Sequence, residues 1–295
     1  TYGGSGALAT ELGIALAHRG HEIHFITYQQ PFRLPSFLPR IYFHEVDVGR
    51  YPLFEYPPYD LALAVRMHEV VLTHKLDLLH VHYAIPHATS AWIAREMLRQ
   101  QHRDVKVITT LHGTDITLVG RDESYLPITK FGIEVSDGVT AVSKFLKQAT
   151  IETFDFDEIE VIPNFICPTH YTRVADSALK RELAPNGERL LTHVSNFRAV
   201  KRPLDCVEIL ARVRLSGQNA RLVLVGDGPE LSAVRYRSET LGVNEYISVV
   251  GKHSNIADYL GVADIFLLPS ELESFGLAAL EAQACEVPVI ATRIG

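Results

Sequence analysis

Short runs of apolar residues alternate with longer amphipathic stretches along the first half of the chain. Leucines at positions 8, 12 and 16, followed by a glycine at 20, predict an opening helix. Continuous valine, isoleucine and leucine runs are typical of strands that are buried on both faces, so the later runs predict a parallel sheet covered by helices. The strands are expected at 21–28, 41–48, 78–83, 105–111, 138–143 and 159–165.

The same alternation restarts in the second half, with strands expected at 190–194, 222–225, 247–250, 265–268 and 287–291. The interval 167–188 between the two halves is polar and contains Pro168, Pro185 and Gly187, which favour loops. We therefore predict two doubly wound α/β domains, at 1–166 and 167–295. Ligand crevices in such domains lie at the carboxyl ends of the strands, and we expect the two crevices to face a shared cleft.

Both ends of the chain fall inside predicted elements. A glycine-rich turn that opens a helix normally follows a strand, but Thr1 and Tyr2 leave no room for one before Gly3. At the other end, the strand expected at 287–291 has no closing helix after it. The sequence is therefore expected to be a fragment that lacks the first strand and the C-terminal helices.

The composition of the chain argues against several classes of protein. Twenty-eight lysines and arginines stand against 35 aspartates and glutamates, so the net charge of −7 argues against a nucleic-acid-binding protein. The cysteines, Cys167, Cys206 and Cys285, are scattered, which argues against a disulfide scaffold or a zinc ribbon. No apolar run approaches about 18 residues, so no stable membrane insertion is expected.

Three segments that follow predicted strands or open a helix carry candidate chemistry. Gly3-Gly4-Ser5-Gly6 lets the backbone approach a ligand at a helix N-terminus, where an anion is favoured, although a plain tight turn has the same residues. Arg198, Lys201 and Arg202 follow the strand at 190–194, where cations can clamp a diphosphate. The alternative for these three cations is a solvated basic start of a helix.

Glu273 and Glu281 form the third candidate. At 100° per residue the two carboxylates share one broad face if a helix runs between them. Carboxylates accept paired hydrogen bonds from vicinal hydroxyls, so the pair suits a sugar or a ribose. Spacing alone is weak evidence, but the apolar residues between them indicate a largely buried helix, where an unpaired glutamate is costly.

Histidines mark two strand ends. His80 and His82 lie on one side of a predicted strand at a spacing that can seat a metal ion, but no carboxylate or cysteine supports them, so no metal site is predicted there. His112 and Thr114 end the next strand, where residues that face a ligand belong. A structural histidine is the alternative for His112.

These motifs together resemble the fourth family of retaining glycosyltransferases, which has the GT-B fold of two Rossmann-like domains. The resemblance rests on the E-x7-E pair Glu273 and Glu281, the cations after 190–194, and the turn Gly226-Asp227-Gly228-Pro229-Glu230. The segments 31–34, 80–87 and 112–117 further resemble the branch of the family that opens bacillithiol biosynthesis. That branch implies UDP-N-acetylglucosamine as donor, L-malate as acceptor, a cytoplasmic location, no metal ion or other cofactor, and a chain that can form a homo-oligomer.

The resemblance also implies a role for each matching residue. Glu273 and Glu281 hold the donor sugar and the uridine ribose, Arg198 with Lys201 or Arg202 neutralises the diphosphate, and His112 lies near the reacting sugar. The remaining donor and acceptor contacts fall to Gly4, Ser5, Ser274, Phe275 and Gly276 for the donor, and to Ser5, Tyr83 and Thr114 for the acceptor, with Arg33 or Lys130 as a candidate cation for malate.

Other functions remain open at this point. The same fold can transfer a sugar to inositol phosphate or to a lipid, or act as a nucleotide-sugar 2-epimerase. A lipid acceptor favours an exposed basic and apolar patch, whereas the first domain shows only isolated cations. A non-enzymatic module that closes on a nucleotide sugar is the alternative from a different class.

Overall fold

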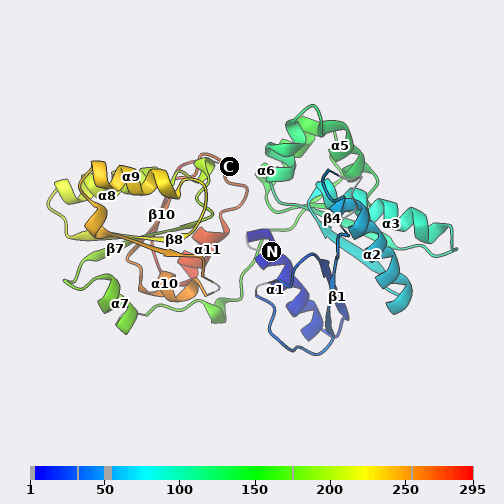
Figure 1. Cartoon of the computed structure of the whole chain (residues 1–295), viewed down its shortest axis with the longest axis horizontal. Coiled ribbons are helices and arrows are strands. Elements are labelled where there is room, and N and C mark those ends of the chain that lie inside the picture. Colours follow the sequence, from blue (N-terminus) through cyan, green and yellow to red (C-terminus); the bar gives the residue numbers. More distant parts are fainter. Residues whose placement is uncertain (1–3, 32, 50–54, 175, 254, 295) are drawn as a thin grey trace. The chain divides into compact units, whose positions relative to one another are not determined.

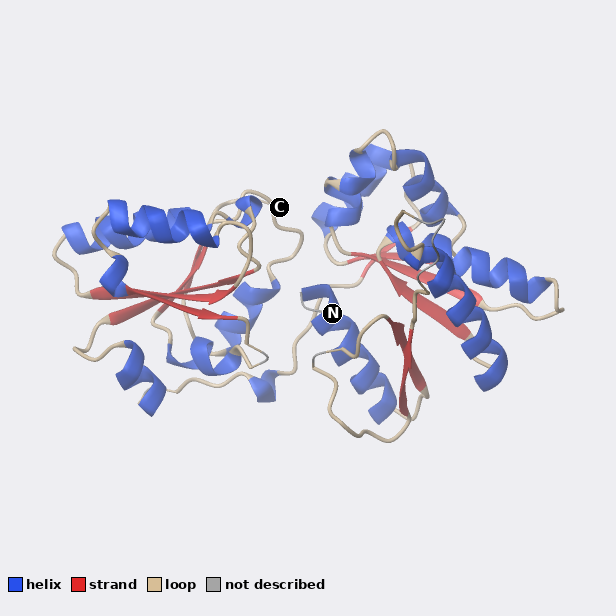
Figure 2. Ribbon diagram, viewed as in Figure 1, coloured by secondary structure: helices blue, strands red, loops and turns tan. Residues whose placement is uncertain are grey.

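The computed structural model describes residues 4–31, 33–49, 55–174, 176–253 and 255–294. Gly3 of the glycine-rich turn and Phe32 of the segment 31–34 therefore lie outside the described residues. Contacts divide the chain into two compact units, Thr1–Asn164 and Phe165–Gly295, close to the predicted boundary (Figure 1). Each unit has parallel strands and helices, as the alternating pattern predicts (Figure 2).

Every predicted strand is present, and each begins and ends within a few residues of the expected range. The strands of the first unit are β1 (Ile23–Thr27), β2 (Ile41–Glu45), β3 (Leu78–His82), β4 (Lys106–Leu111), β5 (Gly138–Ala141) and β6 (Ile159–Val161). Those of the second unit are β7 (Arg189–Ser195), β8 (Ala220–Gly226), β9 (Ile247–Gly251), β10 (Ile265–Leu268) and β11 (Val289–Ala291).

The described strands of the first unit form two sheets. One holds β1 and β2, and the other has the order β3-β4-β5-β6. The strand expected before the glycine-rich turn is not among the described residues. That strand stays a prediction.

Helices connect the strands in both units. Those of the first unit are α1 (Gly4–His18), α2 (Tyr59–His74), η1 (Ala84–Ala88), α3 (Thr89–Arg99), α4 (Thr114–Thr117), η2 (Val119–Arg121), α5 (Leu126–Glu134) and α6 (Lys144–Phe154). Those of the second unit are η3 (Pro168–His170), α7 (Ala178–Leu183), η4 (Ala199–Lys201), α8 (Pro203–Leu215), α9 (Leu231–Thr240), η5 (Asn244–Tyr246), α10 (Ala257–Val262) and α11 (Leu277–Ala284).

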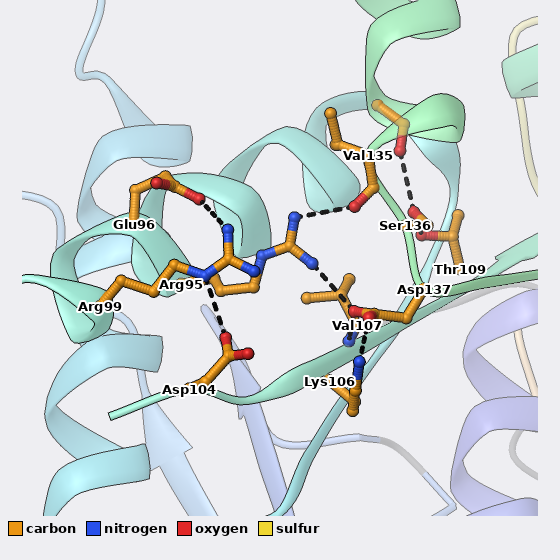
Figure 3. Close-up of polar contacts among 11 residues, drawn as sticks. Arg95, Glu96, Arg99, Asp104, Lys106, Val107, Thr109, Val135, Ser136 and Asp137 are labelled. Carbon is orange, nitrogen blue, oxygen red and sulfur yellow. Dashed lines mark hydrogen bonds and ion pairs between the residues drawn. The ribbon is translucent and has the colours of Figure 1, made fainter. Parts of the chain in front are cut away.

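A charge network centred on the buried Arg95 attaches α3 to the four-stranded sheet of the first unit (Figure 3). The guanidinium of Arg95 donates to Asp137 Oδ2 at 2.9 Å and to the carbonyl of Val135 at 2.8 Å. Asp137 also accepts from Lys106 Nζ at 2.7 Å and from the Val107 N–H at 2.9 Å. Burial raises the pKa of Asp137, but these hydrogen bonds outweigh it, so the pKa lies below its ordinary value. The carboxylate is therefore charged at neutral pH and fixes the helix to the sheet.

The sheet of the second unit has the order β11-β10-β7-β8-β9, and helices cover both of its faces (Figure 2). Alternate residues of β8 show why both faces of the sheet are covered. Leu222 and Leu224 pack in a cluster with α8 and α9, whereas Val223 and Val225 pack in a second cluster with Val262 of α10 on the other face. Side chains alternate between the faces of a strand, so an uninterrupted apolar run fills both layers.

Candidate functional site

The second unit brings two strand ends together at the point where its strand order reverses. From β7 the chain continues through β8 and β9 toward one edge, and then crosses to β10 and β11 on the other side of β7. Ligands of open α/β sheets bind outside the carboxyl ends of the strands at such a switch point. The loop after β7 carries the predicted basic segment, and the loop after β10 carries Glu273.

Lys201 and Glu273 meet at this point although 72 positions separate them. Lys201 Nζ donates to Glu273 Oε2 at 2.7 Å, and the side chains are 25% and 18% exposed. The N–H of Glu271 donates to the carbonyl of Val200 at 2.8 Å, so the backbone also joins the two loops. A carboxylate has about four acceptor positions, and the ion pair therefore leaves Glu273 able to accept hydroxyl groups.

The other two cations of the basic segment have different surroundings. Arg202 Nη2 lies 2.6 Å from Asp205 Oδ2 in the first turn of α8. Arg198 is exposed, and no ion pair involves it in the described part of the chain. The structure thus places Lys201, rather than Arg202, beside Glu273.

The helix that contains Glu281 does not extend back to Glu273, as a shared helical face for the two residues would require. Gly276, with φ of +82°, caps α11, so Glu273 lies on the preceding loop and only Glu281 on the helix. A left-handed residue ends the loop because helical geometry cannot extend back through it. Glu281 is 3% exposed and accepts from the Tyr171 hydroxyl at 2.6 Å. The buried position expected for Glu281 is present, whereas its contact with Tyr171 was not predicted.

His193 belongs to this region, although sequence reasoning missed it. Its Nδ1 lies 2.9 Å from the carbonyl of Leu267 in β10, and its Nε2 lies 2.8 Å from Ser195 Oγ. A carbonyl can only accept, so Nδ1 carries the proton of the neutral ring and Nε2 accepts from the Ser195 hydroxyl, whose oxygen accepts from the Phe197 N–H at 3.2 Å. Burial lowers the pKa of His193 to about 4, and the neutral ring ties β10 to the loop after β7. The sequence signal for His193 was a histidine within the buried strand expected at 190–194.

The glycine-rich turn after β8 packs against the same loop. A Cβ on Gly226 would lie 1.8 Å from the carbonyl oxygen of Ser195, and one on Gly228 would lie 2.0 Å from that of Asn196. The N–H of Glu230 donates to the carbonyl of Phe197 at 3.0 Å. These glycines are required because backbone approaches backbone, and they hold the basic segment in place.

In the first unit, Ser5 and Tyr83 come together. Ser5 lies in the first turn of α1, and its Oγ is 2.5 Å from the hydroxyl of Tyr83, which follows β3. Thr114 is exposed at the start of α4, directly after β4. The first N–H groups of a helix favour an anion, so the start of α1 beside a tyrosine hydroxyl suits a carboxylate.

The cations proposed for this unit are already engaged. Arg33 Nη1 lies 4.0 Å from Glu11, and Lys130 Nζ lies 3.7 Å from Glu134 on the same helix. Neither contact brings the cation to Ser5 or Tyr83.

His112 lies beside Tyr83, with the ring centroids 5.0 Å apart, and its Nε2 is 2.9 Å from His82 Nδ1. Desolvation lowers the pKa of His112 to about 4 and holds that of His82 well below its ordinary value. Both rings are therefore neutral at pH 7. His112 thus supplies no positive charge at this position.

Asp115 ties the loops after β3 and β4 together, a role that sequence reasoning did not assign. It is 2% exposed and accepts from the N–H groups of Gly113 at 2.9 Å, Ala84 at 3.0 Å and His112 at 3.3 Å. Burial raises its pKa, and the three N–H groups oppose that rise. Its position in the segment 112–117, shortly after the strand expected at 105–111, was the available signal.

The buried histidines predict acid sensitivity. His112 and His193 have a pKa of about 4 in the folded chain and about 6.5 when unfolded. Between these values the unfolded chain binds more protons, so stability present above pH 6.5 is lost as the pH falls toward 4. Each such histidine contributes a slope of up to about 1.4 kcal/mol per pH unit.

The urea midpoint of the protein should therefore fall between pH 6.5 and 5. His193→Gln should be less stable at pH 7 but show a smaller decline with pH, whereas the exposed control His170→Gln should follow the parent. A midpoint that stays constant down to pH 5 would contradict the expected histidine linkage.

Comparison with known proteins identifies the class to which this fold and site belong. Residues 2–170 match the family model Glycosyltransferase Family 4, and residues 175–295 match Glycosyl transferases group 1. The chain belongs to glycosyltransferase family 4, has the GT-B fold and is a glycosyltransferase. Among the described residues, none of the helices has the length and apolar character needed to cross a bilayer.

One relative, the N-acetyl-alpha-D-glucosaminyl L-malate synthase of Bacillus anthracis, is 49% identical over 295 residues, covering 99% of this chain and 76% of its own. A D-inositol 3-phosphate glycosyltransferase of Streptosporangium roseum is 24% identical and covers 99% of this chain and 73% of its own. Anabaena Alr3699/HepE in complex with UDP and glucose has a similar fold, with a TM-score of 0.80, 18% identity, and coverage of 99% and 78%. Sucrose-phosphate synthase of Thermosynechococcus elongatus gives a TM-score of 0.72 at 24% identity, with coverage of 99% and 76%.

Proposed function

We propose that this chain transfers N-acetylglucosamine from UDP-N-acetylglucosamine to the hydroxyl of L-malate, in the cytoplasm and with retention at the anomeric carbon. The observation that carries the proposal is the 49% identity, over 99% of the chain, with the malate synthase of Bacillus anthracis. The bond from the anomeric carbon to the diphosphate oxygen breaks, and the malate oxygen forms the new bond on the same face. The hydroxyl proton passes to the departing diphosphate.

The second unit is proposed to hold the donor. Glu273 accepts sugar hydroxyls, with backbone N–H groups of Ser274, Phe275 and Gly276 nearby, and Glu281 accepts from the ribose. The pair between Lys201 and Glu273 at 2.7 Å supports this assignment, because it places a cation beside the sugar-binding carboxylate. Arg198 and Lys201 would neutralise the diphosphate of the leaving UDP.

The first unit is proposed to hold the acceptor. Ser5, Tyr83 and Thr114 would donate to the malate carboxylates, Gly4 and Ser5 would also approach the donor, and His112 would lie near the reacting sugar. The hydrogen bond between Ser5 and Tyr83 supports a shared site at the start of α1. An unpaired buried carboxylate is costly, so several neutral donors are needed for a dianion.

Labelled donor and a panel of acceptors test the transfer. L-malate should give a labelled glycoside with retained configuration, whereas other 2-hydroxy acids and inositol phosphate should give less. Inositol phosphate is the second candidate because the Streptosporangium roseum relative is named for it, although its identity to this chain is only 24%. A preference for inositol phosphate would replace the malate assignment, and an absence of product with every acceptor would favour a non-catalytic module.

Loss of Tyr83 or Thr114 should act on the acceptor. Tyr83→Phe removes the hydroxyl that contacts Ser5, and Thr114→Val removes an exposed hydroxyl at a helix start. Each should raise the KM for malate by about tenfold, the value of roughly one hydrogen bond, and leave the KM for the donor nearly unchanged. The control Tyr125→Phe, at an exposed tyrosine of the same unit, should behave as the parent. Unchanged malate kinetics in both variants would remove these residues from the acceptor site.

Transfer should continue in EDTA. Arg198 and Lys201 carry out the charge neutralisation for which other transferases use a divalent ion. Initial rates in excess EDTA and after added Mg²⁺ should agree within error. Loss of activity in EDTA with recovery in Mg²⁺ would show that the leaving group depends on a metal ion.

A further inference from the structure

Three histidines outside the proposed transfer site gather at the edge of the first unit. His24 lies on β1, His44 on the neighbouring strand β2, and His74 is the last residue of α2. One ring nitrogen from each lies within 4.8 Å of the others. Among the residues that the structure describes, this is the group of histidine, cysteine or acidic side chains close enough to hold a metal ion. We call it the His24 cluster.

The sheet register produces this arrangement. His44 pairs with Ile26, two residues after His24, so the two histidines lie diagonally on one face of the parallel pair. His24 Nδ1 is 2.7 Å from His44 Nε2, and the ring of His74 lies 4.4 Å from that of His24 between centroids. The three rings thus converge from two strands and a helix end.

Glu22 adds a second feature typical of metal centres. Its Oε1 lies 2.9 Å from His24 Nε2, the nitrogen that does not face His44. A carboxylate on the far nitrogen fixes the tautomer and orientation of a ligating histidine and raises its basicity. The His24 side chain is only 1% exposed, so the orientation is held by packing as well.

We propose that the His24 cluster binds a divalent transition-metal ion of the zinc class, with His24 Nδ1, His44 Nε2 and His74 as ligands and Glu22 orienting His24. Imidazole suits zinc and its neighbours, at metal–nitrogen distances of 2.0–2.1 Å. Tetrahedral ligands at those distances are about 3.3 Å apart. The 2.7 Å pair therefore opens slightly, while His74, which is exposed, moves inward and leaves the fourth position to solvent.

Some charges around the His24 cluster oppose the binding of a cation and others favour it. The positive charge of Arg66, on α2, lies close enough to His44 to oppose a bound cation. The carbonyl end of α2, where His74 lies, and the carboxylate of Glu22 favour a cation and oppose the repulsion from Arg66.

Zinc titration of the full chain, after removal of metals with a chelator, tests the proposal. The parent should bind one equivalent of Zn²⁺, and its melting temperature should rise with Zn²⁺ concentration. Co²⁺ should give the visible absorption of a tetrahedral nitrogen-rich site. His74→Gln, at an exposed position, should weaken Zn²⁺ binding at least about tenfold, and Glu22→Gln should weaken it by about tenfold.

His170→Gln, at an exposed histidine of the second unit, is the matched control and should bind as the parent. Equal Zn²⁺ affinity in His74→Gln and the parent, or no binding by the parent, would overturn the proposal. The result does not depend on sugar transfer, because the variants lie outside the groups assigned to donor and acceptor.

Discussion

Glu273→Gln is expected to lower kcat by about 30- to 1000-fold. This range corresponds to about 2–4 kcal/mol, the usual cost of removing one group that stabilises the transition state. An amide offers one acceptor oxygen instead of two and also loses its ion pair with Lys201, which is 2.7 Å away. The loss should therefore appear in kcat for the sugar transfer more than in the KM for malate. Steady-state rates with labelled donor measure it.

Glu271→Gln is the matched control for that result. Glu271 lies two residues earlier on the same loop and is exposed, and its backbone N–H, which the substitution leaves intact, makes the contact to Val200. It should retain the parent rate. If Glu273→Gln also retains the parent rate, Glu273 has no part in the transfer and the donor assignment fails at its central residue.

Gly226→Ala is expected to destabilise the second unit by about 2–5 kcal/mol, from overpacking together with a disfavoured backbone conformation. Gly226 has φ of +129°, and its new Cβ would lie 1.8 Å from the carbonyl oxygen of Ser195. Relief requires β7 and β8 to separate at their carboxyl ends, which would also displace the loop that carries Lys201. The urea midpoint and the transfer rate should therefore both fall.

Gly217→Ala separates the effect of the positive φ from the effect of the close contact with Ser195. Gly217 also has a positive φ, of +84°, but nothing lies within 4 Å of its added Cβ. It should cost only about 1 kcal/mol and leave the transfer rate unchanged. Similar losses of stability in the two variants would mean that backbone conformation, rather than close approach to Ser195, makes Gly226 necessary.

The strands were predictable because their signal is local. A buried parallel strand must be apolar on both faces, so its residues identify it without knowledge of its neighbours, as Leu222 to Val225 illustrate. The start of α11 was less predictable. Helical spacing between Glu273 and Glu281 is compatible with a longer helix, and the left-handed conformation of Gly276 moves the start to Leu277.

Candidate site residues were also found from local signals, but their partners were not. Cations and carboxylates directly after strands indicate a ligand site, since strand ends are where parallel sheets bind ligands. Whether Lys201 or Arg202 lies beside Glu273 depends on the backbone conformation of the 3-10 helix Ala199–Lys201 and of the left-handed residue Arg202 that follows it. His193 and Tyr171 gave only weak signals because their function lies in contacts made by the folded chain.

The pattern of apolar residues and the motifs identify the two α/β halves, the family and residue types that suit sugar and phosphate chemistry. Which residues meet depends on the folded chain: Ser5 contacts Tyr83 across 78 positions, and Tyr171 contacts Glu281 across 110. The His24 cluster likewise depends on the register of β1 against β2 and on the point where α2 ends. Such contacts follow from strand order and register, which arise from packing among distant segments and leave no periodic pattern in the chain.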